Sequence, residues 1–153
     1  MSAKELEKWL GDHQLNVWIK SDEGLRLQPY TDTVGKLTIG YGRNLSDNGI
    51  SKEEAEIMFQ NDLTVAVNSL KQYSWFLVQP DSIKRALINM CFNVGLSRLL
   101  GFRKMIDALI HRDYTRAAQE ALNSKWARQV PNRAKDIAVM LRTGNNDVST
   151  RRN

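Results

Sequence analysis

Cysteine, histidine and proline are all scarce in this chain of 153 residues, which contains one, two and three of them respectively. The single cysteine, Cys91, allows no intramolecular disulfide and no cysteine-rich metal cluster. It lies in the apolar segment ALINMCF, where a small core residue is expected. The fold should therefore form without disulfide bonds, as in proteins of a reducing compartment.

Long apolar runs are also missing, and the N-terminal segment MSAKELEKWLGDHQ is rich in charge. We therefore expect no signal peptide, no transmembrane helix and no stable membrane anchor. Neither His13 nor His111 has a nucleophile and an orienting acid beside it, and no phosphate loop or dinucleotide fingerprint occurs. The sequence predicts no bound metal and no cofactor.

Basic residues outnumber acidic ones by 22 to 17, which gives a net charge of +5 and a pI near 9.5. This excess favours an anionic partner: a nucleic acid, an anionic lipid or an acidic cell-wall polymer. The basic residues are spread along the chain apart from Arg151 and Arg152, so they give little support to nucleic-acid binding.

The first third of the chain contains two predicted helices followed by strands. Ser2 and Glu5 have capping-box spacing and should open a short helix that stops at Gly11. A second helix is expected over 13–23, with Gly24 as its terminator. Alternating apolar residues over 24–45 predict a small antiparallel sheet, closed by a turn at 46–49.

The remainder of the chain has the patterns of helices. Capping-box spacing at Ser51 and Glu54 predicts a helix running to about Tyr73, and another should run from Pro80 to Gly95 and form the buried centre of a helical lobe. Further helices are expected at about 102–111, 115–123 and 132–142, the last of them introduced by Pro131 and stopped by Gly144. The apolar stripe of the 51–73 helix is interpreted as core; it comprises Ala55, Met58, Phe59, Ala66 and Leu70.

These elements predict a mainly α, α+β fold with two lobes in one domain spanning 1–153. The small lobe with the sheet should cover about 24–50, and a connecting helix about 51–72. The helical lobe should combine 1–23 with 73–153. A cleft between two lobes is a favoured place for a ligand.

One stretch, DEGLRLQPYTDTVGKLTIGYG (22–42), has chemistry that stability alone does not explain. Asp22 and Glu23 fall in the last turn of a predicted helix, where the helix dipole disfavours acids. A carboxylate in that place is a poorer anion, which favours the protonated form that a general acid needs. The alternative is that Glu23 is simply a solvated acid at a helix end.

The same stretch resembles the active-site segment of the T-even-type phage lysozymes (endolysins), glycoside hydrolase family 24. That family has Glu, an eight-residue gap, Asp, a five-residue gap and Thr, and Glu23, Asp32 and Thr38 have this spacing. The segments RALINMCFNVG (85–95) and SKWARQVPNRAK (124–135) resemble two further segments of the family, in the same order.

The resemblance implies a lysozyme-like fold and a role for each matching residue. Glu23 would be the general acid, Asp32 would position or deprotonate the attacking water, and Thr38 would hold that water. The family inverts the anomeric centre, which needs a carboxylate separation of roughly 6.5–9.5 Å. Arg133 matches an arginine that pairs with the catalytic glutamate, and such a pair would oppose the effect of the helix dipole.

Other matches concern substrate binding. Gly42 and Asn44 match positions near bound sugar, and Phe92 and Asn93 match positions in the wall of the cleft. Arg43 departs from the pattern, because a relative has there a histidine that pairs with an acid of the helical lobe. Asp81 and Asp107 are the candidate partners of Arg43. The segment after Asn44 is shorter than in that relative, so the small lobe should be trimmed.

The function implied is that of a peptidoglycan muramidase, an enzyme that hydrolyses the β-1,4 bond between N-acetylmuramic acid and N-acetylglucosamine with inversion. It would be a monomeric endolysin, held in the host cytoplasm until a separate holin allows it to reach the wall. The alternatives are an inactive wall-binding relative and a small basic helical protein that binds nucleic acid. The complete set of Glu23, Asp32 and Thr38 speaks against the first alternative, and only net charge supports the second.

Overall fold

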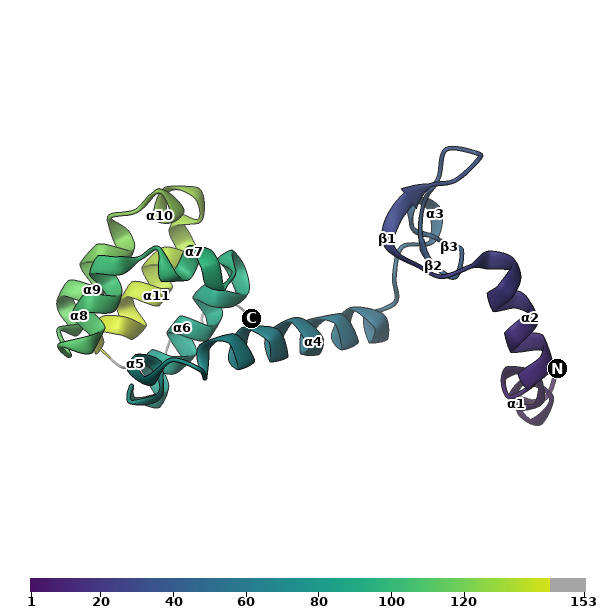
Figure 1. Ribbon diagram of the computed structural model, residues 1–153, viewed down its shortest axis with the longest axis horizontal. Coiled ribbons are helices and arrows are strands. Elements are labelled where there is room, and N and C mark those ends of the chain that lie inside the picture. The colour runs from purple at the N-terminus through teal and green to yellow at the C-terminus, as the bar shows by residue number, and fades with distance from the viewer. Residues whose placement is uncertain (144–153) are drawn as a thin grey trace. The chain divides into compact units, whose positions relative to one another are not determined.

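The computed structural model describes residues 1–143, and these form two compact units (Figure 1). One unit is Met1–Ala55 and the other begins at Glu56. The boundary falls near the start of the long helix α4 (Lys52–Leu70).

The first unit begins with two helices, α1 (Ala3–Leu10) and α2 (His13–Glu23). The capping box predicted for α1 is present, since Ser2 Oγ accepts from the Glu5 amide (3.2 Å) and Glu5 Oε2 accepts from the Ser2 amide (2.8 Å). Asp12 caps α2 by accepting from the Leu15 amide, and α2 ends where predicted, at Gly24. Both helices are therefore fixed by local sequence signals.

A three-stranded antiparallel sheet follows, in the order β1 (Arg26–Thr31), β2 (Leu37–Gly40) and β3 (Arg43–Asn44). The turn predicted at 46–49 is instead the end of one helical turn, α3 (Leu45–Asn48). Asn44 caps it by accepting from the Asp47 amide, and an acid in the first turn suits the positive end of a helix.

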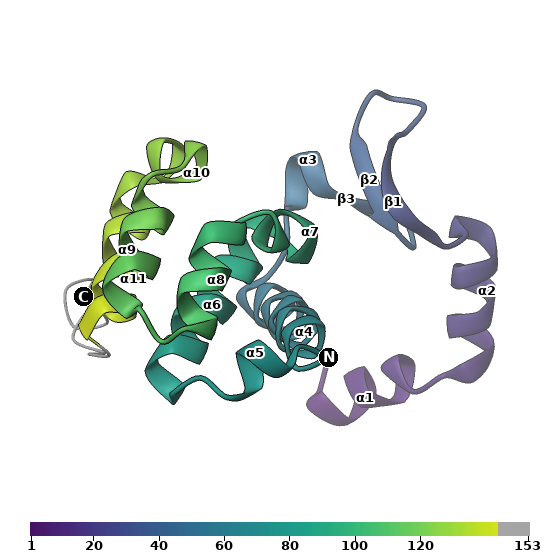
Figure 2. The ribbon, with the colours of Figure 1, turned by 60° about the vertical axis from the view of Figure 1, so that its left-hand side comes forward.

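The second unit consists of helices only, within the described residues (Figure 2). After α4 the helices are α5 (Ser74–Leu77), α6 (Asp81–Val94), α7 (Leu96–Leu100), α8 (Arg103–Ile110), α9 (Tyr114–Leu122), α10 (Lys125–Gln129) and α11 (Pro131–Thr143). The helices predicted near 80–95, 102–111, 115–123 and 132–142 are confirmed, and Pro131 opens α11 as expected. The long helix stops at Leu70, before the predicted end at Tyr73. The predicted stop at Gly144 lies outside the described residues.

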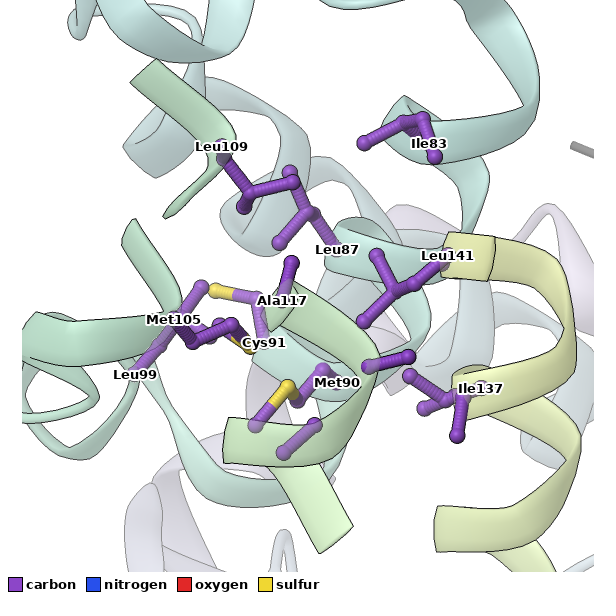
Figure 3. Packing of buried hydrophobic residues seen from close by; sticks show 14 of the residues in the cluster. Ile83, Leu87, Met90, Cys91, Leu99, Met105, Leu109, Ala117, Ile137 and Leu141 are labelled. Atoms are coloured by element: carbon purple, nitrogen blue, oxygen red, sulfur yellow. The ribbon is translucent and has the colours of Figure 1, made fainter. Parts of the chain in front are cut away.

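The core of this unit gathers side chains from α6, α7, α8, α9 and α11 (Figure 3). Five residues of α6 are buried, as expected: Ile83, Ala86, Leu87, Met90 and Cys91. Burial is nevertheless one-sided, because Asp81, Arg85, Asn89 and Phe92 form an exposed face of the same helix. α6 therefore contributes to the core of the helical lobe as expected, but through one face only.

The apolar stripe of α4 is buried only towards its C-terminal end. Ala66 and Leu70 are buried, whereas Met58 and Phe59 are exposed, so the interpretation of the whole stripe as core is wrong. Ala55 and Met58 lie near the start of the helix, and both are exposed.

Leu87→Ala should destabilise the helical unit by about 2–5 kcal/mol, because it removes a fully buried side chain from packed surroundings. Chemical denaturation of the variant, followed by circular dichroism, measures this loss. Leu77→Ala is the matched control, since the side chain of Leu77 is half exposed. Equal losses in the two variants would contradict the burial of Leu87.

The observed elements confirm the predicted class, a mainly α, α+β fold of the lysozyme-like kind. The grouping of residues 1–23 with the helical lobe stays a prediction. Among residues 1–143, no helix is both long enough and apolar enough to cross a lipid bilayer.

Candidate active site

Glu23 is the last residue of α2, and its carboxylate lies against the backbone of Gly42. A Cβ placed on Gly42 would lie 2.8 Å from the Glu23 Cδ and would also clash with Oε2. Gly42 has φ of +69°, a conformation that residues with a side chain rarely adopt. Glycine at position 42 thus provides both the turn and the space that the Glu23 carboxylate occupies.

Asp32 lies in the hairpin that joins β1 to β2 and is anchored through one of its two oxygens. Its Oδ1 accepts from the amides of Val34 (3.0 Å) and Lys36 (2.8 Å). Its own amide donates to the Lys36 carbonyl, at 2.9 Å. Within residues 1–143, Oδ2 has no hydrogen-bond partner. The carboxylate is therefore held in place while one oxygen is left to accept a proton.

Thr38 is buried in the middle of the sheet, with 3% of its surface exposed. It pairs with Tyr30 on β1 and with Asn44 on β3. Its Oγ1 donates to the Lys36 carbonyl at 3.1 Å, so towards any other group this hydroxyl acts as an acceptor.

Lys36 connects two of the predicted catalytic residues through its backbone. Its amide donates to Asp32 and its carbonyl accepts from Thr38. Sequence reasoning did not identify Lys36, because a backbone role leaves no trace in residue type. The only available signal was its place between the two residues.

Gly42 and Asn44 were predicted to lie near bound sugar. The Asn44 side chain is engaged at both ends by Asp47, since Oδ1 accepts from the Asp47 amide (3.0 Å) and Nδ2 donates to Asp47 Oδ2 (2.9 Å). Its contact with sugar stays a prediction, as does that of Gly42.

The helical unit carries the other predicted site residues. The Phe92 ring packs at 5.6 Å from that of Phe59, and Asn93 Oδ1 accepts from Trp126 Nε1 at 2.7 Å. Trp126 is itself buried. Asn93 is thereby fixed to the core of the unit.

Arg133 is half-buried and lines a pocket of about 310 Å³ together with Phe92 and Arg85. In the part of the chain that is described, no acid lies within ion-pair distance of Arg133. Glu23 belongs to the other unit, so the predicted pairing of Arg133 with Glu23 stays a prediction.

Arg43 is paired with Glu54 rather than with either predicted partner. Its Nη1 and Nη2 donate to Glu54 Oε2 (2.9 Å) and Oε1 (2.6 Å), and Nη1 also donates to the Gly49 carbonyl. Asp107 pairs instead with Arg116, and Asp81 pairs with no cation among residues 1–143. The spacing of Ser51 and Glu54 predicts only a capping box, a role that Glu54 also fulfils, and gives no sign of its pair with Arg43.

This pair ties β3 to the first turn of α4. The hydrogen bond from Arg43 is the main cause that lowers the pKa of Glu54, and the hydrogen bond from the Ser51 amide is the second. Glu54 in turn raises the pKa of Arg43. A carboxyl group whose pKa is lowered on folding adds stability above its ordinary pKa, and this stability is lost as the pH falls through the lowered value.

Glu54→Gln should therefore lower the melting temperature at pH 7. The difference from the wild type should shrink as the pH falls below the ordinary carboxyl pKa of about 4.3 and disappear below the lowered pKa of Glu54. Thermal unfolding at a series of pH values measures this. Glu53→Gln, the exposed neighbour without an ion pair among the described residues, is the control. A difference that persists at low pH would contradict the assignment of this effect to ionised Glu54.

No cluster of three or more potential metal-ligating side chains occurs in the range 1–143.

The fold and the comparison with known proteins point to the same class of protein. A mainly helical α+β fold with a small three-stranded sheet is of the lysozyme-like class. Residues 20–142 match the family model described as phage lysozyme, so the chain belongs to the phage lysozyme family.

Three relatives are each 30% identical to the chain. Probable T4-type lysozyme 1 of Dictyostelium discoideum aligns over 82% of this chain and 92% of its own length. The pre-baseplate central spike protein Gp5 of Enterobacteria phage T4 aligns over 83% of this chain but only 27% of its own length. An endolysin of Acyrthosiphon pisum secondary endosymbiont phage 1 aligns over 76% and 79%, respectively. The family match and the relatives named as a lysozyme and an endolysin support a lysozyme-like function.

Proposed function

We propose that the protein is a peptidoglycan muramidase that hydrolyses the β-1,4 bond between N-acetylmuramic acid and N-acetylglucosamine with inversion at the anomeric carbon. The observation that carries this proposal is the arrangement around Lys36. Lys36 anchors one oxygen of Asp32 and turns the Thr38 hydroxyl into an acceptor, while the other Asp32 oxygen has no partner within residues 1–143.

This arrangement suits the activation of a water molecule. A water that donates one hydrogen to Asp32 Oδ2 and the other to Thr38 Oγ1 keeps a lone pair free for attack on the anomeric carbon. Asp32 then takes the proton as the carbon–oxygen bond forms, which is the part of the general base in inverting glycosidases.

Glu23 is the proposed general acid. Its carboxyl group gives its proton to the glycosidic oxygen as the bond breaks. This proton enters the leaving sugar, while a proton of the attacking water passes to Asp32. The two carboxyl groups should be separated by roughly 6.5–9.5 Å in the active enzyme, which leaves room for the attacking water. Arg133 would pair with Glu23, and Gly42, Asn44, Phe92 and Asn93 would contact the sugar chain.

The biological role proposed is that of an endolysin. The enzyme would act as a monomer on bacterial peptidoglycan, and a holin would allow it to pass from the host cytoplasm to the wall at lysis.

Clearing of a suspension of purified cell walls tests the activity, and proton NMR of fresh product tests the stereochemistry. The first product should be the α-anomer, because the β-linked substrate is inverted. An inactive wall-binding relative would bind walls without clearing them, and a β-anomer as first product would contradict the role given to Asp32.

Asp32→Asn should lower the rate of wall clearing by about 10²–10⁴-fold, the range for loss of a positioned general base. Asparagine keeps an oxygen that can accept from the Val34 and Lys36 amides, so the hairpin should be retained. Asp47→Asn is the control, as Asp47 is an exposed acid whose partners are Lys36 and Asn44. Comparable losses in both variants would show that the effect comes from the small sheet and not from catalysis.

A further inference from the structure

A pocket of about 480 Å³ opens in the helical unit between α7, α8 and the end of α9. As far as the described residues go, it shares no lining residue with the pocket that contains Phe92 and Arg133. Three basic side chains line it: Arg98 from α7, and Arg103 and Lys104 from the first turn of α8. Its volume lies in the range of about 300–1,000 Å³ that is common for ligand pockets.

None of these three cations has an ion-pair partner in the part of the chain that the structure describes. Among the described lining residues, Glu120 is the one acid, and it forms no ion pair with these cations. In the free protein the three positive charges repel one another, and the single negative charge of Glu120 does not balance them. A bound anion would relieve this repulsion, and the positive end of α8 adds to the same field.

The wall of the pocket is preorganised by the core. The Phe102 ring packs edge-on against Trp126 at 6.0 Å between centroids, and Met105 is buried. Asn123 and Ser124 complete the polar part of the wall. The cations are therefore mounted on rigid elements, which lowers the cost of ordering them around a ligand.

We propose that this pocket binds a phosphate group. An arginine side chain presents a planar fork of donors that matches phosphate oxygens in pairs, and lysine adds a point charge. Three cations suit a group with several charged oxygens better than a single carboxylate. The phosphate could be carried by an envelope polymer or be free in solution.

The phosphate site itself does not depend on the proposed function. Its biological role does: the site would keep the enzyme on the wall between cuts. Binding of a phosphate-bearing polymer here would hold the helical unit on its substrate and would weaken as salt rises.

Titration of the isotope-labelled full chain with inorganic phosphate at constant ionic strength, followed by NMR, tests the site. The amide signals of Arg98, Arg103 and Lys104 should shift together and saturate. Arg103→Gln with Lys104→Gln should weaken this binding at least 10-fold. Lys135→Gln removes an exposed cation of α11 outside the pocket and should leave it unchanged.

Shifts that do not saturate, or an equal loss in the Lys135 variant, would overturn the proposal. Should the double variant fail to fold, Arg98→Gln alone, which changes one exposed side chain, should still weaken binding. Unchanged affinity in that variant would exclude Arg98 and with it the three-cation site.

A sedimentation assay distinguishes the two sources of phosphate, using walls before and after removal of their phosphate polymers with hydrofluoric acid. Stronger retention on untreated walls, lost in the double variant, assigns the polymer. Equal retention, with a positive titration, assigns free phosphate. Glu23→Gln protein is used so that the walls stay intact, and failure of wild-type wall clearing would concern the proposed function and not this site.

Discussion

Replacing Glu23 by glutamine should lower wall clearing by about 10²–10⁴-fold, the contribution of a positioned general acid. Glutamine has nearly the same shape as glutamate but has no acidic proton to give to the leaving sugar. The side chain is exposed at the end of α2 and fits against Gly42, so the fold should be unaffected.

Asp22→Asn is a close control for this variant. Asp22 is an exposed acid in the same last turn of α2, so the helix loses the same charge near its negative end. It should keep full activity, and both variants should unfold within about 0.5 kcal/mol of the wild type. Substantial activity of the Glu23 variant would remove Glu23 from the mechanism.

Replacing Gly42 by alanine should reduce activity almost as strongly, although position 42 has no chemistry of its own. The added Cβ would occupy the space of the Glu23 carboxyl group, which must then move. A displacement of about 1 Å in a catalytic group can cost 10²-fold in rate. The rate of wall clearing should therefore fall about 10²-fold.

Gly40→Ala separates this effect from backbone strain. Gly40 has the same φ of +69°, and a Cβ there would meet no atom of residues 1–143 within 4 Å. Both substitutions should destabilise by a similar amount, about 1–2 kcal/mol for a residue forced into the left-handed region. Only the Gly42 variant should lose most of its activity. Equal activity in the two variants would show that Gly42 does not set the position of Glu23.

Local signals in the sequence predicted the helices well. The capping residues Ser2 and Ser51 and the terminators Gly24 and Gly95 mark real helix boundaries, because each is determined by contacts within one turn. The short helices α5, α7 and α10 were not predicted. Four or five residues are too few for a helical period to show in an apolar pattern.

Contacts between segments distant in sequence were harder to foresee. The Arg43–Glu54 pair was not anticipated, since many acids could reach one long side chain and only the fold selects among them. The bond from Trp126 to Asn93 and the backbone link through Lys36 depend in the same way on the folded arrangement. The resemblance to the phage lysozymes identified Glu23, Asp32 and Thr38 as candidates, but it gave neither the Asp32 oxygen that lacks a partner within residues 1–143 nor the orientation of the Thr38 hydroxyl.

The four tryptophans are distributed equally between the two units, and this gives each unit its own optical probe. Trp9 and Trp18 belong to the first unit and are exposed, whereas Trp75 and Trp126 belong to the helical unit and are half-buried and buried. Phenylalanine in place of one pair leaves fluorescence from the other unit alone. Denaturant titrations of the two double variants would then reveal whether the units melt as one cooperative block or in succession.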